Sequence, residues 1–169
     1  VVALKTTHNH LLDKLLPAPT REGGAVLMLQ NGLGVESAAA DVVGADRVLG
    51  GLCFICSTKV GPGHIQHLDY GFVTLAQHSA DGRAAGVTDL MRRVGSDLQA
   101  AGIDVRLAED LVAARWRKLV WNVPFNGLSV VLNARIDELI SDPATRALAE
   151  SLMREVAAAS AACGRPVED

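Results

Sequence analysis

Residues 25–34 read Ala-Val-Leu-Met-Leu-Gln-Asn-Gly-Leu-Gly, an apolar run that ends in a turn. The run Ala25–Gln30 has the length and composition of a buried strand, and a short helix is expected from about Val35. Similar apolar runs, Val1–Leu4 and Val48–Ile55, lie before and after it. Strands that alternate with helices over short connections predict a parallel, doubly wound α/β sheet.

The segments around these strands have other sequence patterns. A helical stretch over Leu11–Leu16 is expected to end at the prolines that follow it. Between Cys53 and Gln77, turn signals at residues 61–63 and 69–71 separate short alternating runs, which predicts an antiparallel meander. A helix over Asp89–Ala101 and a strand over residues 103–107 complete the α/β part.

After residue 107 the pattern is entirely helical. We expect one long stretch from Glu109 to about Leu132, broken by Pro124 and Gly127. A second helix should run from Ser141-Asp142-Pro143 to Gly164, because an N-cap followed by proline is a strong start signal. Its apolar face is expected at Leu148, Leu152, Val156 and Ala159. The predicted domains are therefore residues 1–107 and 108–169.

Composition excludes several classes of protein. The 169 residues are 49% hydrophobic and 4% aromatic, which excludes collagen-like and disordered chains. The 16 Lys+Arg and 19 Asp+Glu leave a net charge of -3 without a basic cluster, so nucleic-acid binding is not expected. No apolar stretch approaches the ~20 residues that span a bilayer. Three cysteines favour a reducing cytoplasm. The apolar start at Val1, without Met, suggests part of a longer protein.

Lys5 and Asn31 each follow a predicted strand. The carboxyl ends of parallel strands meet at one edge of the sheet, where open α/β sheets bind ligands. We therefore expect both side chains in that crevice, the alternative for Lys5 being a solvated strand end. Residues 32–37 partly match the glycine-rich fingerprint of dinucleotide-binding proteins. Ser37, however, stands where the fingerprint has its third glycine, and no acidic residue lies at the end of the next predicted strand. A tight turn entering a helix is the better interpretation.

The stretch Trp116-Arg-Lys-Leu-Val-Trp-Asn-Val-Pro-Phe-Asn-Gly127 is the most informative one. Lys118, Asn122 and Asn126 recur every four residues and form one polar stripe on a helix whose other sides are apolar. Burying these polar side chains costs free energy unless another polar group forms hydrogen bonds with them. This favours a functional role over the alternative, a solvated face on a kinked helix.

Neither the cysteines nor the histidines form a convincing metal or nucleophile site. Cys53 and Cys56 lie three apart on a predicted strand, so they face opposite sides and are interpreted as buried small hydrophobes. His8 and His10 are two apart at a helix start and do not face each other.

Four motifs together resemble the ketopantoate reductase (2-dehydropantoate 2-reductase) family. They are Val2-Ala-Leu-Lys5, Leu29-Gln-Asn-Gly-Leu-Gly34, Gly63-His-Ile-Gln-His67, and Trp116-Arg-Lys-Leu119 with Asn122 and Asn126. The resemblance implies that Lys118 is the catalytic general acid and that Asn122 and Asn126 bind substrate. It also implies that Asn31 lies near nicotinamide and substrate, and that Lys5 lies near the cofactor.

The resemblance further implies the architecture and the reaction. The chain would comprise the second half of a Rossmann-type NADP-binding domain and the first helices of an all-α, 6-phosphogluconate dehydrogenase-like substrate and dimerisation domain. The expected activity is NADPH-dependent reduction of 2-dehydropantoate to pantoate in cytoplasmic pantothenate and coenzyme A synthesis, by a possible homodimer. The alternatives are a sibling reductase of another small 2-keto acid and a non-catalytic oligomerising module. No metal, nucleic acid or membrane is expected.

Overall fold

The computed structural model describes residues 1–167, which fall into two compact units that divide after Leu111. The elements of the first unit, in chain order, are η1 Thr6–Leu11, α1 Leu12–Leu15, α2 Pro17–Thr20, β1 Val26–Met28, α3 Ser37–Val43, η2 Ala45–Arg47, β2 Val48–Gly61, β3 His64–Gln77, α4 Asp89–Ala100 and β4 Asp104–Leu107.

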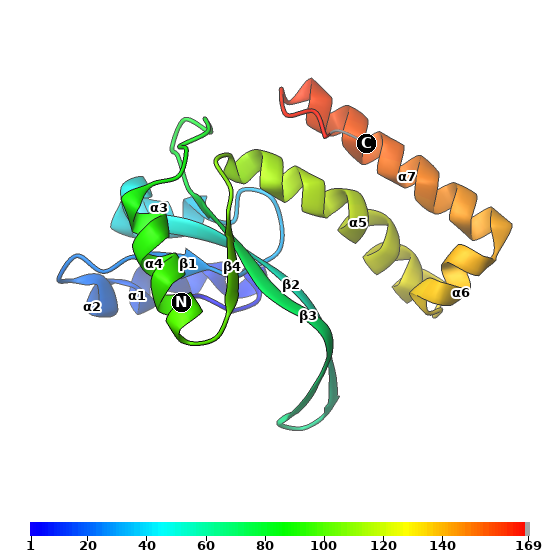
Figure 1. The fold of residues 1–169 in the computed structure, drawn as a ribbon, viewed down its shortest axis with the longest axis horizontal. Helices are drawn as coiled ribbons and strands as arrows, with labels where there is room; N and C mark the ends of the chain where they lie inside the picture. The colour runs from blue at the N-terminus through cyan, green and yellow to red at the C-terminus, as the bar shows by residue number, and fades with distance from the viewer. Residues whose placement is uncertain (168–169) are drawn as a thin grey trace. The chain divides into compact units, whose positions relative to one another are not determined.

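The strands of this unit form one four-stranded sheet among the described residues, in the order β1-β2-β3-β4. β1 and β2 are parallel, with Val26 opposite Val48, and α3 lies in the connection between them. β3 and β4 are also parallel and are connected through α4, whereas β2 and β3 are antiparallel (Figure 1). Each helix-containing connection therefore joins parallel neighbours, which confirms the predicted α/β class.

Two hydrophobic clusters cover the two faces of the sheet. Val26 and Met28 of β1 pack with Leu12 of α1 and Ala39 of α3. Leu27, between them in sequence, packs on the other side with buried side chains of β2, β3 and α4. Successive strand residues point to opposite faces, so the run Val-Leu-Met supplies both clusters. A strand that is apolar at every position is typical of a sheet covered on both sides.

The expected strand at Val1–Leu4 is reduced to one bridge, so that part of the prediction is wrong. Val2 is buried and pairs in parallel with Met28, which confirms its place beside β1. Val1 is 82% exposed and Leu4 is 40% exposed, however. The chain leaves the sheet after Leu4 and enters η1 at Thr6, so only Val2 remains on the packed face.

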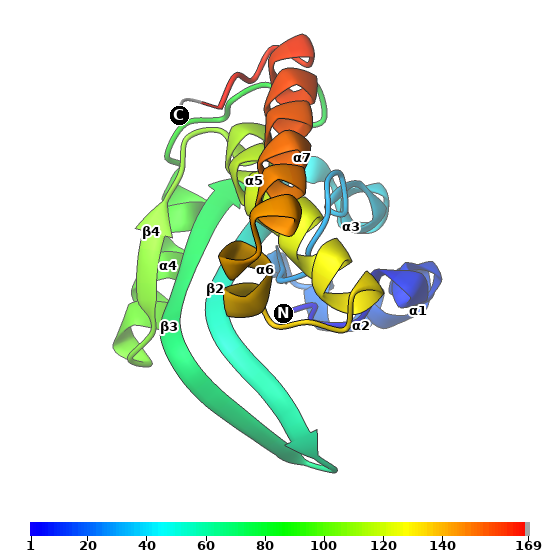
Figure 2. The ribbon, with the colours of Figure 1, turned by 90° about the vertical axis from the view of Figure 1, so that its right-hand side faces the viewer.

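The predicted meander is a single long hairpin. β2 and β3 have 14 residues each and join at residues 62–63, forming the curved arm seen in Figure 2. The turn expected at residues 69–71 is a bulge: Phe54 pairs with Phe72, and Ile55 pairs with Tyr70. Tyr70 has a φ of 62° there. A bulge accommodates one extra residue without reversing the chain. The residue types at 69–71 suit a bulge as well as a turn, so the sequence alone does not distinguish the two.

The prolines after Leu16 do not end helical structure as predicted. Pro17 is the first residue of the short helix α2. Proline suits that position, because its fixed φ is helical and the first turn needs no N–H donor.

The second unit consists of α5 Leu111–Val131, which starts at the last residue of the first unit, α6 Ile136–Ser141 and α7 Pro143–Ala162. Figure 1 shows the three helices in chain order. The core of this unit joins them through Phe125, Leu139 and Ala149. α5 is continuous through Pro124 and Gly127, so the predicted break is wrong.

The start predicted for the last helix is confirmed, but of the four residues predicted for its apolar face only Val156 is buried. The carboxylate of Asp142 accepts a hydrogen bond from the backbone N–H of Thr145 at 2.8 Å, as an N-cap does. Ala149, Val156 and Ser160 are the buried residues of α7, whereas Leu148 is 47% exposed.

Candidate functional site

Lys5 and Asn31 lie at the ends of two paired segments in the first unit. Val2 N donates to Leu27 O at 2.8 Å, and Leu29 N donates to Val2 O at 2.9 Å, so the two segments run in parallel. Lys5 and Asn31 follow them on the same edge of the sheet, and both residues are exposed. The first unit therefore brings together an ammonium and an amide at the carboxyl edge, where α/β sheets bind ligands.

Gln30, which precedes Asn31, was missed by sequence reasoning. Its side chain is 4% exposed, and its Nε2 donates to Leu4 O and to Asn9 Oδ1, both at 2.7 Å. The one signal in the sequence is an amide that ends an apolar strand, and such a residue is usually interpreted as the start of a loop.

The loop after Asn31 is a tight turn, as expected for residues 32–37. Gly32 and Gly34 have φ values of 116° and 74°, and α3 begins at Ser37. Glu36, at the start of α3, is 2% exposed. Its burial was not predicted, because an acidic residue at a helix start is normally solvated.

Lys118, Asn122 and Asn126 lie on the uninterrupted helix α5 of the second unit. Four residues turn an α-helix by about 40° beyond a full turn and advance ~6 Å, so the three side chains form a slowly winding stripe ~12 Å long. Lys118 and Asn122 are half-buried, whereas Asn126 is exposed. The stripe can therefore present one ammonium and two amides to an elongated polar ligand.

An aromatic pair lies beside the stripe. The ring centroids of Trp121 and Phe125 are 4.2 Å apart, Phe125 is buried and Trp121 is 49% exposed. One helical turn separates these residues, so the half-exposed ring of Trp121 packs over the buried ring of Phe125 and leaves an apolar surface on α5. Polar groups beside an apolar surface are typical of small-molecule sites.

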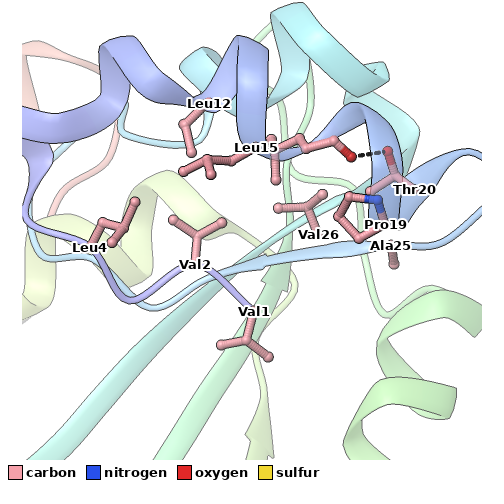
Figure 3. A pocket seen from close by; sticks show the side chains of 10 residues that line it. Val1, Val2, Leu4, Leu12, Leu15, Pro19, Thr20, Ala25 and Val26 are labelled. Carbon is pink, nitrogen blue, oxygen red and sulfur yellow. Dashed lines mark hydrogen bonds between the residues drawn. The ribbon is translucent and has the colours of Figure 1, made fainter.

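A pocket of about 410 Å³ in the first unit contains none of the five predicted site residues (Figure 3). It is lined by Val1, Val2, Leu4, Leu12, Leu15, Leu16, Pro19, Thr20, Ala25 and Val26. Its hydroxyl, that of Thr20, already donates to Leu16 O at 2.7 Å. The lining contains no charged or amide side chain that could hold the carboxylate of a keto acid, so the pocket is not the candidate active site.

Other site chemistry is limited. Within residues 1–167, no three His, Cys, Asp or Glu side chains gather as a metal site would require. Within the described residues, Cys53, Cys56 and Cys163 form no disulfide, and Cys56 is exposed, so its predicted burial is wrong. None of the helices described is long and apolar enough to cross a membrane.

The fold and the residues together define a class: a Rossmann-type α/β unit with a lysine and an asparagine at the carboxyl edge of its sheet, followed by helices that carry a further lysine. The family described as "Ketopantoate reductase PanE/ApbA" matches residues 1–80, and "Ketopantoate reductase PanE/ApbA C terminal" matches residues 110–169. The chain belongs to the ketopantoate reductase family.

Individual relatives agree with this assignment. A 2-dehydropantoate 2-reductase of Nostoc sp. (strain PCC 7120) is 55% identical over all 169 residues, which cover 53% of its own length. The crystal structure of 2-dehydropantoate 2-reductase from Geobacter metallireducens GS-15 is 38% identical, with a TM-score of 0.82 over 92% of this chain and 50% of that one. The chain spans about half the length, or less, of the curated relatives it matches.

A third solved structure has the same fold at a much lower sequence identity. D-mandelate dehydrogenase, solved with NADH, has a TM-score of 0.82 over 97% of this chain and 53% of its own, at 20% identity. At that identity the likeness shows the shared fold alone.

Proposed function

We propose that the protein carrying this chain reduces 2-dehydropantoate to pantoate with NADPH, a step of pantothenate and coenzyme A synthesis. The observation that carries the proposal is the Lys118, Asn122 and Asn126 stripe on an unbroken helix, in a chain 55% identical to a 2-dehydropantoate 2-reductase. Residues 1–107 would then belong to the NADP-binding domain and residues 108–169 to the substrate domain.

Lys118 is assigned as the general acid. When bound, NADPH supplies a hydride to the keto carbon, and negative charge develops on the carbonyl oxygen. The Lys118 ammonium can polarise that oxygen before the transfer and donate a proton to it afterwards, which yields the hydroxyl group and the neutral amine.

Asn122 and Asn126 are assigned to the rest of the substrate. Each amide offers two N–H donors and one carbonyl acceptor, which suits the carboxylate and the hydroxyl of a hydroxylated 2-keto acid. Because the three side chains are spaced along the helix, only one of them can reach the reacting carbonyl.

Lys5 and Asn31 are assigned to cofactor binding, and Asn31 is also assigned to substrate binding. An ammonium complements the charge of a dinucleotide, and an amide can pair with the nicotinamide carboxamide or with the substrate. The donors present at this edge therefore fit a nicotinamide cofactor.

Steady-state kinetics of the full-length protein test these assignments. Lys118→Ala should lower kcat by at least ~100-fold, the range expected for a lost general acid or charge stabiliser. Asn122→Ala and Asn126→Ala should mainly raise KM for 2-dehydropantoate. Lys59→Ala, an exposed lysine on the β2–β3 arm, is the matched control and should change neither constant.

Two results would contradict the proposal. A full-length protein that fails to oxidise NADPH with 2-dehydropantoate does not have this function. If Lys118→Ala keeps a normal kcat and changes only KM, Lys118 binds substrate, and the proton must come from Lys5 or a water molecule.

A sibling reductase of another small 2-keto acid is the second candidate. It is favoured by the fold shared with D-mandelate dehydrogenase, since the same framework occurs in a protein named for an aromatic substrate. A higher kcat/KM for an aromatic 2-keto acid than for 2-dehydropantoate would select it, and the ratio of kcat/KM with NADPH to that with NADH tests the cofactor.

Location and assembly belong to the same proposal. The absence of a disulfide among the described residues is compatible with a reducing cytoplasm. A homodimer is proposed by analogy with the dimeric ketopantoate reductase of Staphylococcus aureus, and sedimentation of the full-length protein tests it.

A further inference from the structure

The backbone pairing at the ligand-binding edge is continued by a side chain. The bonds Val2 N to Leu27 O and Leu29 N to Val2 O are successive rungs of a parallel ladder. In a regular ladder the carbonyl of Leu4 would next accept from the backbone N–H of Asn31. The Nε2 of Gln30 donates to Leu4 O at 2.7 Å. An amide side chain thus bridges the two segments where they leave the sheet.

The same nitrogen also holds the first helical turn. Gln30 Nε2 donates its second hydrogen bond to Asn9 Oδ1, on η1, at 2.7 Å. A primary amide nitrogen has two N–H donors, and these two acceptors use both. Gln30 is 4% exposed, so losing either bond leaves a polar group without solvent.

Lys5 is therefore fixed from both sides. The carbonyl before it, that of Leu4, is held by Gln30, and its own carbonyl accepts from His8 N at 2.9 Å. Asn31 follows Gln30 directly. One buried amide thus determines how far apart the backbones of Lys5 and Asn31 lie and in which direction each continues.

We propose that Gln30 is a positioning residue, which sets the separation of Lys5 and Asn31 and so controls the binding of the cofactor and of the keto-acid end of the substrate. It acts through these two neighbours. This inference rests on the proposed function for the identity of the ligands, but its structural part does not depend on them.

The test compares Gln30→Met with Gln77→Met in the full-length protein. Methionine has nearly the shape of glutamine without its donors. Gln77 is an equally buried amide whose Nε2 donates to Val48 O at 3.0 Å, at the start of β2 and so at the opposite edge of the sheet. Both variants should lower Tm, because both lose bonds of a buried amide.

Only Gln30→Met should affect binding. We expect it to raise the Kd for NADPH and the KM for 2-dehydropantoate by about tenfold each, with a smaller change in kcat. The backbone N–H of His8 donates to the carbonyl of Lys5. Hydrogen exchange at this N–H should become faster in Gln30→Met and stay unchanged in Gln77→Met.

Asn9 provides a second pair of variants that keeps the test decisive if Gln30→Met does not fold. Asn9→Asp retains an oxygen acceptor for Gln30 Nε2 and should preserve both constants. Asn9→Leu removes the acceptor and should shift Kd and KM in the same direction as Gln30→Met.

The outcomes separate this inference from the proposed function. A full-length protein that does not reduce 2-dehydropantoate refutes the function, yet the NADPH titration and the His8 exchange still apply. If Gln30→Met and Gln77→Met destabilise the protein alike while Kd, KM and His8 exchange stay unchanged, Gln30 is merely structural and the inference is wrong. Equal behaviour of Asn9→Asp and Asn9→Leu would overturn it as well.

Discussion

Gly51 offers a direct test of the packing between β1 and β2, because a single methyl group has no room there. A Cβ at residue 51 would lie 2.5 Å from Leu29 Cδ2 and 2.9 Å from Leu27 Cδ1. Carbon atoms pack best at ~3.5–4.0 Å, so both contacts overlap by roughly 1 Å. Leu27 is 5% exposed and cannot turn into solvent.

Two opposing terms set the magnitude of Gly51→Ala. Overpacking a well-packed core costs roughly 1–3 kcal/mol, whereas alanine gains about 0.5–1 kcal/mol over glycine in a strand. The midpoints of these two ranges leave a net destabilisation of about 1.3 kcal/mol. For a chain of this size that corresponds to a fall in Tm of roughly 3–5 °C.

Thermal and urea unfolding measure the change, and a double variant identifies its cause. Leu29→Val removes the atom at 2.5 Å, so Gly51→Ala should be less harmful in that background, with a coupling free energy of about 0.5–1 kcal/mol or more. An unchanged Tm in Gly51→Ala, or strictly additive effects in the double variant, would refute the reasoning.

Three further predictions concern the second unit. Gly127→Ala on α5 should stabilise the protein by about 1 kcal/mol in urea unfolding, because the added Cβ meets nothing within 4 Å and alanine favours a helix. Asn133 has a φ of 47°, so Asn133→Val should lower Tm, whereas Asn133→Gly should leave it nearly unchanged. The N–H of Thr145 donates to Asp142 and holds the pKa of that carboxyl below its usual value of 3.8. The stability that ionised Asp142 contributes is therefore complete above pH ~4 and is lost as pH falls through the lowered pKa. The fall in Tm caused by Asp142→Ala should be largest at pH 7 and should shrink as the pH is lowered below ~4.

β1 could be predicted because the apolar run Ala25–Gln30 is long compared with its surroundings. The same criterion failed at Val1–Leu4, where only Val2 forms a bridge. The β2–β3 arm was harder, because a turn and a bulge favour the same residues. Only the pairing of Tyr70 with Ile55, across the hairpin, decides between them, and pairing is not a local property of the sequence.

The site residues divide in a similar way. Lys118, Asn122 and Asn126 could be selected because four-residue spacing is a local property of one helix, and α5 preserves it. Gln30 could not be selected, because its partner Leu4 O lies 26 residues away and the bond exists only once two segments have paired. Residues that position other residues are the hardest to predict when their partners are distant in sequence.

Pro124 shows why the break expected in α5 does not occur. Proline cannot donate to the carbonyl of Val120, and its ring crowds that carbonyl. In the helix Pro124 lies about 200° around the axis from Asn122, on the side away from the stripe. Pro124 is fully buried, and its neighbour Phe125 packs in the core of the second unit. Packing on that side offsets the missing hydrogen bond, while Lys118, Asn122 and Asn126 keep regular helical spacing on the other.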